Sequence, residues 1–509
     1  MLERFARNTL YGVLAALSGS LGSFATTIVV ARLLGVAETG VFNFALWVMS
    51  LATAATDLGA YASLARYLPE LTRSGPSATA QRLAGYLLVP FATVTILGLL
   101  AFIVLAIYVD VDPATAARYE IGLHPSQWVI VGALYVAQAF SNFTVGYFQG
   151  SQRFDIAAKL AVYTAAVRLT ATTIGCYWLG ATGALLGYVV GLAISAPIPF
   201  AVSRYGGTLS PDLRRRVRRY SLFAWASTLA SALIVARPEV AILNYFHGKE
   251  AVGLYSTAFT LANLAIQGPL LLTAGLVPYF SEHAGTGERP LLEKMMSSGT
   301  RLMAFMILPM AFGTAALAPE LVPLLFGKAF GEAADPAVIL IASSCLGGNS
   351  MLFAGLIIGM ERSDFSFYLN LSGAALTLLI GFLLIPHLGT VGAAFGRALV
   401  QLYLFVLSAW FVLRRLSYPI PFAHLSRLLL AAIGCAVCAR LILQVNPGIA
   451  GMVSAVCVAA AVYFLLVRLL RGLEHSDVDR LRSLLNSAPG VLRVPITAMF
   501  IHLASKPQT

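Results

Sequence analysis

Charged residues are scarce in this chain, and polar blocks of domain size are absent. Only 11% of the 509 residues are Asp, Glu, Lys or Arg, which leaves no room for a soluble catalytic domain. Neither GxSxG nor a P-loop motif occurs, and the seven histidines are scattered without metal-ligand spacing. We therefore predict that the protein is not an enzyme and has no catalytic residue, no metal site and no cofactor.

Cysteine is rare as well. The five cysteines fall in apolar runs, where a thiol acts as a small hydrophobic group. Cys435 and Cys438 form a CxxC pair, but no further Cys or His lies nearby to complete a metal site. We expect these residues to pack in the core, without a disulfide framework.

Apolar residues make up 59% of the chain and gather in runs that recur from end to end. Each run is about 20 residues long, the length that crosses a bilayer as a helix. We predict an all-α polytopic membrane protein with about fourteen transmembrane helices. The runs are centred near residues 20, 50, 97, 137, 168, 192, 233, 265, 309, 348, 376, 401, 435 and 458.

Basic residues indicate the orientation in the membrane. With the N-terminus in the cytoplasm, nearly all Lys and Arg residues of the connections face inward, and only Arg32, Arg118, Lys249 and Lys328 face outward. We therefore place the protein in the cell (inner) membrane with both termini cytoplasmic. This asymmetry accounts for most of the net charge of +12, so the basic composition does not favour nucleic-acid binding.

Two polar segments lie between or after the spans. The run RRRVRR (214–219) precedes the seventh span, and we interpret it as a topogenic linker that contacts lipid headgroups. In the tail, HSDVDRLRSLL has Ser476 three residues before Asp479. This capping-box pattern predicts a short amphipathic helix at the inner membrane surface.

Three segments occur twice in the same order. LLGVAETGVFNFAL (33–46) returns as FHGKEAVGLYSTAF (246–259), which pairs glycines 213 residues apart. GSQRFD and LGATGALLG, which begin at residues 150 and 179, return 209 residues later as GMERSD and LGTVGAAFG. Because six predicted spans separate the copies, both enter the membrane in the same direction, as parallel repeats about an axis along the membrane normal.

The repeat predicts the domain organisation. Residues 1–210 form one six-helix lobe, 211–419 form a second, 420–470 form two extra C-terminal helices, and 471–509 form a cytoplasmic tail. Gly183, Gly187 and Gly191 recur every fourth residue, a spacing that favours close helix packing.

Charges inside apolar runs are the candidate functional residues, because each costs about 2.5 to 3.5 kcal/mol near the bilayer centre. Arg168 lies midway along the fifth span with no acidic residue three or four positions away. We expect it to line a polar cavity, with a structural pair across helices as the alternative. Arg397, in the twelfth span, either contacts substrate or snorkels. Asp57, near the inner end of the second span, is either a structural hydrogen-bonding group or a proton or ion carrier.

Arg237, Pro238 and Glu239 interrupt the apolar stretch LIVARPEVAILNYF (233–246). Residues two apart on a helix cannot form a local ion pair, but a proline opens the backbone ladder, so we expect Pro238 to be a hinge. Arg237 and Glu239 then line a cavity or hold a kink through interhelical ion pairs. Because deep arginines outnumber deep carboxylates, and Arg binds phosphate through paired hydrogen bonds, we predict an anionic substrate.

Several motifs carry a resemblance that covers almost the whole chain: ARLLGVAETGVFNFAL (31–46), DLG (57–59) followed by Arg66, GKEAVGLYSTAF (248–259), VPYFS (277–281) and LLFGKAFGEAA (324–334). Together they resemble the multidrug/oligosaccharidyl-lipid/polysaccharide (MOP) exporter superfamily, in its polysaccharide transporter branch that includes O-antigen flippases. The resemblance implies outward transfer of a polyprenyl-pyrophosphate-linked oligosaccharide, by alternating access of two lobes, for cell-surface polysaccharide biosynthesis. Its implied partners are this anionic lipid-linked glycan, membrane lipids and other polysaccharide assembly proteins.

The resemblance also assigns residues. It places Arg32, Asp57 and Arg66 in the signature of the first lobe and Glu239 at an acidic position before the glycine echo. For Arg32, helix-end charge compensation and substrate contact are both open. No coupling-ion motif carries over, so proton or sodium coupling through Asp57 or Glu239 stays open.

Three other functions fit the sequence less well. A drug or cation antiporter of the same superfamily fits poorly, because its cavity needs carboxylates and twelve spans suffice. A membrane-bound polysaccharide polymerase or glycosyltransferase usually needs a sizeable outer loop, and the longest outer connections here are short. A purely structural role does not account for arginines within the spans of a two-fold repeat.

Overall fold

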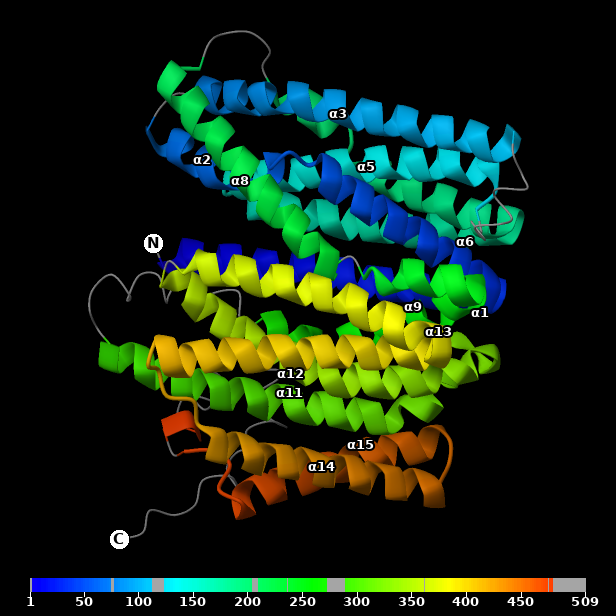
Figure 1. The fold of residues 1–509 in the computed structure, drawn as a ribbon, viewed down its shortest axis with the longest axis vertical. Helices are drawn as coiled ribbons and strands as arrows, with labels where there is room; N and C mark the ends of the chain where they lie inside the picture. The colour runs from blue at the N-terminus through cyan, green and yellow to red at the C-terminus, as the bar shows by residue number, and fades with distance from the viewer. Residues whose placement is uncertain are drawn as a thin grey trace. The chain divides into compact units, whose positions relative to one another are not determined.

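The computed structural model describes residues 2–74, 77–111, 123–203, 209–235, 237–271, 289–360, 362–474 and 476–478. Every regular element within these ranges is a helix (Figure 1). The chain divides into two compact units: the first comprises Met1–Thr260, Leu325–Phe330 and Asn370–Ala393, and the second comprises Leu261–Leu324, Gly331–Leu369 and Ala394–Thr509. The domain boundaries drawn from the sequence stay a prediction.

In chain order the helices are α1 (Leu2–Thr56), α2 (Ala60–Ser74), α3 (Ser77–Val111), α5 (Pro125–Gly150), α6 (Phe154–Ala193), α7 (Ile198–Val202), α8 (Pro211–Val235), α9 (Glu239–Leu271), α11 (Arg289–Phe326), α12 (Ala334–Gly359), α13 (Ser363–Trp410), α14 (Phe422–Val445) and α15 (Ile449–Leu469). A 3₁₀ turn, Lys328–Ala333, precedes α12, and a π turn, Phe411–Arg415, follows α13.

The helices confirm a multi-pass membrane protein. Among the described residues, nine helices are long and apolar enough to cross a membrane. One face of α3 is exposed at Val104 (64%), Ile107 (59%) and Val111 (77%), a helical spacing of large apolar side chains that suits lipid rather than water. Its opposite face, with Leu83, Leu87 and Phe91 among others, packs into the core of the first unit.

Three of the nine apolar helices are 46, 49 and 52 residues long, about twice the length of one crossing. Each is interrupted by a glycine with positive φ: Gly35 in α1, Gly180 in α6 and Gly389 in α13. α9 is interrupted in the same way at Gly248. Each long helix therefore contains two segments, and the expected fourteen spans are consistent with this architecture.

The interruptions occur at repeated positions with repeated geometry. Gly35 has φ 77° and ψ −174°, and its counterpart Gly248 has φ 71° and ψ −172°. Gly180 has φ 60° and ψ −138°, and Gly389 has φ 55° and ψ −131°. Residues with a Cβ rarely adopt positive φ, so the paired sequence motifs encode paired bends of the backbone.

The arms on either side of these bends pack closely. In α6, Gly175 and Gly183 face each other so that a Cβ on either would overlap the other's carbonyl oxygen. In α13, a Cβ on Gly392 would lie 2.6 Å from the carbonyl oxygen of Leu384. Both helices therefore double back at their glycine, and the predicted packing role of Gly183 is confirmed.

A reciprocal contact joins the two copies of the first motif within the first unit. A Cβ on Gly40 would overlap the carbonyl oxygen of Lys249, and a Cβ on Gly253 would overlap that of Val36. Lys249 and Gly253 are the counterparts of Val36 and Gly40, each 213 residues later. Because each copy presents the same surface to the other, a pseudo-two-fold axis passes through this crossing of α1 and α9.

In the second unit, α14 packs along α15 (Figure 1). Buried residues of both helices join α11 in one apolar cluster, in which the hydroxyl of Tyr463 donates to the carbonyl oxygen of Phe305 at 2.8 Å. The two helices without a repeat partner are thus integrated into the core of this unit.

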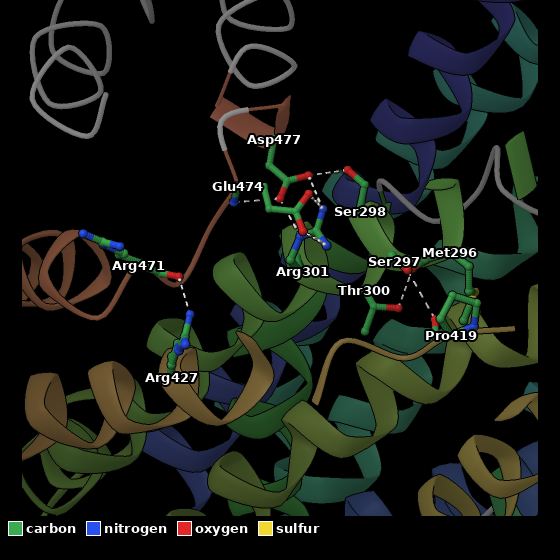
Figure 2. A network of polar contacts seen from close by, with 10 residues as sticks. All are labelled: Met296, Ser297, Ser298, Thr300, Arg301, Pro419, Arg427, Arg471, Glu474 and Asp477. Carbon is green, nitrogen blue, oxygen red and sulfur yellow. Dashed lines mark hydrogen bonds and ion pairs between the residues drawn. The ribbon is translucent and has the colours of Figure 1, made fainter. Parts of the chain in front are cut away.

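The beginning of the tail is fastened to α11 by a buried ion pair (Figure 2). The Nε of Arg301 donates to Asp477 Oδ2 at 2.6 Å, with side-chain exposures of 5% and 0%. Ser298 donates to the other oxygen of Asp477, and Arg301 also bonds Glu474 at 2.9 Å. The backbone N–H of Glu474 donates to Asp477 at 3.2 Å. Glu474, rather than Ser476, is therefore the cap residue, so the predicted capping register is wrong; residues 479–509 lie outside the described residues.

The Gly40 crossing predicts a strong effect of one methyl group. Gly40→Ala should lower the free energy of unfolding by about 1 to 3 kcal/mol or more, because the new Cβ meets backbone. Gly313→Ala is the matched control: its Cβ would lie 3.9 Å from Cys435 Sγ, and alanine favours a helix by about 1 kcal/mol. Thermal unfolding of the purified variants measures both. Equal midpoints would show that α1 and α9 are not in backbone contact.

The ion pair at Arg301 predicts unequal effects for its two carboxylates. Asp477→Ala leaves a buried guanidinium without its main partner and should cost about 3 to 5 kcal/mol. Glu474→Ala removes a side chain that is 49% exposed, and should cost at most about 1 kcal/mol. Chemical or thermal unfolding compares the two. A larger loss for Glu474→Ala would contradict the network.

Candidate functional site

Arg168 is buried in the first arm of α6, with 7% of its surface exposed. Its Nη1 donates to the hydroxyl of Tyr188 at 3.1 Å, and its Nη2 donates to Ser23 Oγ at 3.0 Å and to the carbonyl oxygen of Gly19 at 3.4 Å. Its guanidinium also lies over the Tyr188 ring, 4.8 Å from the centroid. All these partners are neutral, so the positive charge of Arg168 is solvated but not neutralised by them.

Glycines determine where Arg168 lies. A Cβ on Gly191, in the returning arm of α6, would lie 2.5 Å from Arg168 Cβ, and one on Gly22 would lie 3.3 Å from its Nη2. The small residues let α1 and both arms of α6 close around the guanidinium. Its Nε has no hydrogen-bond partner among the described residues, which leaves one donor for another group.

Arg237 and Pro238 form a break between two helices. α8 ends at Val235 and α9 begins at Glu239, and Arg237 has φ 55°, an uncommon conformation for a residue with a side chain. The carbonyl oxygen of Pro238 accepts the N–H of Ala241 at 3.1 Å, so Pro238 lies at the start of α9. Proline is well tolerated there because its missing N–H would be unpaired in any case. The hinge role of Pro238 stays a prediction.

The two charges beside the break contact aromatic residues of α9. The guanidinium of Arg237 lies 4.6 Å from the ring centroid of Phe259. Glu239 is 3% exposed, and its Oε1 accepts the hydroxyl of Tyr255 at 2.7 Å. This arrangement places opposite charges and two aromatic rings on one broken helix within the first unit.

Arg32 and Arg397 occupy different surroundings. The Nε of Arg32 donates to the carbonyl oxygen of Leu325 at 2.8 Å, in the last turn of α11. The final carbonyls of a helix lack intrahelical partners and carry a partial negative charge, so this contact compensates a helix end. Arg397 is half-buried in the second arm of α13. The second unit holds Arg397, whereas the first holds the other predicted site residues; convergence on one cavity stays a prediction.

Asp57 lies in the turn between α1 and α2, just beyond the apolar span. Its carboxylate accepts the backbone N–H groups of Gly59 and Tyr61, at the start of α2. Burial raises the pKa of the Asp57 carboxyl, and these two hydrogen bonds oppose the shift. Leu58 and Gly59 both have positive φ, which identifies the DLG motif as a tight helix-initiating turn.

Tyr188, Tyr255 and Phe259 are the contact residues that the sequence did not reveal. Each lies 16 to 22 positions from the charge that it contacts, beyond the range of local helical pairing. The repeat offered one signal, because Tyr255 aligns with Phe42 and adds a hydroxyl beside Glu239. The described residues contain no cluster of three His, Cys, Asp or Glu side chains that could hold a metal ion.

Two family profiles match more than half of the chain each. Residues 5–284 match the family described as polysaccharide biosynthesis protein. Residues 160–464 match the family described as lipid II flippase MurJ. The two matched ranges overlap and together cover most of the chain.

Individual relatives are distant. A probable low-salt glycan biosynthesis flippase, Agl15 of Haloferax volcanii, is 22% identical over 185 residues, which cover 36% of this chain and 39% of that protein. Among solved structures, lipid II flippase MurJ in an inward closed conformation matches with a TM-score of 0.70 at 12% identity, over 90% of this chain and 98% of that one. An inward-facing MATE multidrug resistance transporter of the MOP superfamily matches with 0.58 at 15% identity, over 79% and 98%. The chain spans about two fifths of the curated relative, and the structural matches show the fold.

The turn at Asp57 predicts that the stability difference between the unmodified chain and an Asp57→Asn variant depends on pH. Asp57→Asn keeps an oxygen acceptor and removes a buried charge, so at pH 7 it should be at least as stable as the unmodified chain. Because the folded pKa is raised, the stability that Asp57 contributes is lost as pH rises through that pKa; the advantage of Asn should therefore shrink as the pH falls toward about 4. Asp57→Ala loses the acceptor and should cost about 0.5 to 2 kcal/mol. The free energy of unfolding of each variant, measured from pH 4 to 7, tests this prediction. Equal losses of stability for Asp57→Asn and Asp57→Ala would assign the role to the charge of Asp57 itself.

Proposed function

We propose that this chain, which belongs to the polysaccharide biosynthesis protein family of the MOP superfamily, translocates a polyprenyl-pyrophosphate-linked oligosaccharide from the cytoplasmic to the outer leaflet of the cell (inner) membrane. Both matched families and the curated relative support the coarser part of this proposal, a multi-pass flippase for a lipid-linked glycan rather than an enzyme. We further propose that the lipid carrier is a polyprenyl pyrophosphate, that transport runs outward, and that both termini of the chain are cytoplasmic.

The observation that carries the proposal is the charge of Arg168. A guanidinium deep in an apolar unit costs free energy unless an anion or a set of dipoles stabilises it. Here Tyr188, Ser23 and Gly19 supply dipoles only, and the Nε has no partner among the described residues. A phosphate group can accept two parallel hydrogen bonds from an arginine, which suits this donor set.

Access to Arg168 requires motion, because 7% exposure leaves it covered by α1 and α6 in this structure. In the proposed mechanism, alternating access opens this face to one leaflet and then to the other. The break at Arg237 and Pro238 is a point at which α8 can change direction relative to α9 during this motion. An inside-negative potential favours outward movement of a negative headgroup by about 2.3 kcal/mol per charge per 100 mV.

Coupling to a proton or a sodium ion is a separate part of the proposal. Glu239 is the better placed of the two carboxylates, because it is 3% exposed and bonded to a hydroxyl inside the first unit. Asp57 already holds the start of α2 through backbone N–H groups. We therefore assign any coupling role to Glu239.

The proposal is tested in liposomes that contain the purified full chain and a short-chain pyrophosphate-linked glycan, with exposure of the glycan on the far leaflet as the readout. Arg168→Ala and Arg237→Ala should each slow transport about 10- to 100-fold, the effect of losing one charge-assisted hydrogen bond of 1.5 to 3 kcal/mol. If both variants transport at the full rate, the basic-cavity mechanism fails.

The matched control is Arg440→Ala. Arg440 is also an arginine of an apolar helix, but it is paired with Glu320 at 2.7 Å and is 43% exposed. The Arg440→Ala variant should therefore transport the glycan at the rate of the unmodified chain. A structural role for Arg168 predicts a different pattern, in which Arg168→Ala lowers the unfolding midpoint and Arg168→Lys restores the midpoint and the rate together.

A further inference from the structure

A basic pocket lies in the first unit, apart from the intramembrane charges. It has a volume of about 640 Å³, within the usual size of small-molecule sites. Its lining residues come from α3, from the connection before α8 and from the first two turns of α8: Tyr86, Leu209, Ser210, Pro211, Arg214, Arg215 and Arg218. Three arginines therefore face one concave space.

Helical spacing explains which arginines of the RRRVRR run line the pocket. Arg214 and Arg218 are four positions apart and Arg215 and Arg218 are three apart, so the three share one side of α8. Val217 points the other way and is fully buried in the apolar cluster of the first unit. Asp212, the acidic residue of the first turn, is not among the lining residues.

α8 packs against neighbouring helices of the first unit through several polar contacts. Ser221 Oγ is 2.6 Å from Ser63 Oγ in a buried contact, and Arg216 forms an exposed ion pair with Glu70 of α2 at 3.0 Å. Further along, the indole N–H of Trp225 donates to the carbonyl oxygen of Ala55 at 3.0 Å. The segment expected to be a linker is therefore a packed helix with an ordered basic face.

The first turn of the helix adds to the positive field. Ser210 and Pro211 stand at the start of α8, where unpaired N–H groups and the helix dipole favour anions. The guanidinium of Arg214 lies 5.3 Å from the ring centroid of Tyr86, a cation–π contact that orients it across the pocket wall. Because Arg214, Arg215 and Arg218 are exposed, a ligand can reach all three without a change of fold.

We propose that this pocket binds the phosphate group of a lipid headgroup. Arginine is the side chain best suited to phosphate, and a patch of three beside a membrane span selects an anion held at the lipid surface. Two lipids share this chemistry: an anionic phospholipid of the bilayer and the pyrophosphate carrier of the proposed substrate. Only the second source rests on the proposed function.

The test measures binding to the purified full chain in nanodiscs, without transport. One arm titrates phosphatidylglycerol into phosphatidylcholine nanodiscs, and the other titrates a short-chain polyprenyl pyrophosphate that carries no sugar. At about fivefold per arginine, the substitution of Arg214, Arg215 and Arg218 by Gln should weaken binding about 100-fold. Saturation by phosphatidylglycerol alone identifies the bilayer lipid, and saturation by the pyrophosphate identifies the carrier.

Neighbouring single variants provide the matched control. Arg218→Gln removes one lining charge, whereas Arg219→Gln removes the same charge from a residue outside the lining. Arg218→Gln should weaken binding about fivefold and Arg219→Gln less than twofold. Equal effects of the two variants would mean that lipid is attracted by net surface charge and not by the pocket, and would overturn the proposal. The absence of saturable binding in both titrations would overturn it as well. If the unmodified chain binds the pyrophosphate in nanodiscs but moves no glycan in the liposome assay, the proposed function fails and the pocket stands.

Discussion

The close approach of helix backbones at glycine is the constraint on which the rest of this structure depends. Within the bilayer the hydrophobic effect does not drive helices together, because lipid tails are as apolar as the side chains. The helices associate instead through direct packing and a few hydrogen bonds. The crossing at Gly40 and Gly253 brings backbone against backbone, and the bends at Gly180 and Gly389 fold long helices back on themselves. Such contacts also position a polar side chain, because Arg168 reaches Ser23 and Tyr188 where Gly22 and Gly191 let the helices close.

The repeat shows how one scaffold holds different charges. At an offset of 209 residues, Thr377 is the counterpart of Arg168 and Arg397 is the counterpart of Tyr188. Thr377 is satisfied within its own helix by the carbonyl oxygen of Gly373 at 2.8 Å, whereas Arg168 needs partners on two other segments. Each copy therefore carries one arginine in this hairpin, but on opposite arms.

The sequence predicted the features that depend on local or repeated pattern. Apolar length identified the spans, and the glycine echoes identified the repeat. The bends at the paired glycines, whose φ and ψ agree within a few degrees, were not predicted. It did not predict the partners of Arg168 or Glu239, because Tyr188 and Tyr255 come into reach only after the chain has turned back or wound several turns. It placed Pro238 inside a helix, although a φ of 55° at Arg237 ends the helix first. It also missed Asp477 as the buried partner of Arg301, since the two lie 176 residues apart.

The difference between the copies also bears on charge balance. At the bends of α1 and α9, Thr26 and Phe42 of the first copy correspond to Glu239 and Tyr255 of the second, at an offset of 213. Thr26 bonds the carbonyl oxygen of Gly22 at 2.7 Å, so the first copy is neutral there, whereas the second holds a carboxylate beside Arg237. The two copies therefore differ by one buried carboxylate at this pair of positions. Burying a carboxylate is costly unless a donor bonds it, and Phe42 could not supply the hydroxyl that Tyr255 gives to Glu239. The exchange of Thr for Glu is thus accompanied by an exchange of Phe for Tyr, which lets one backbone scaffold carry a charge in only one of its two copies.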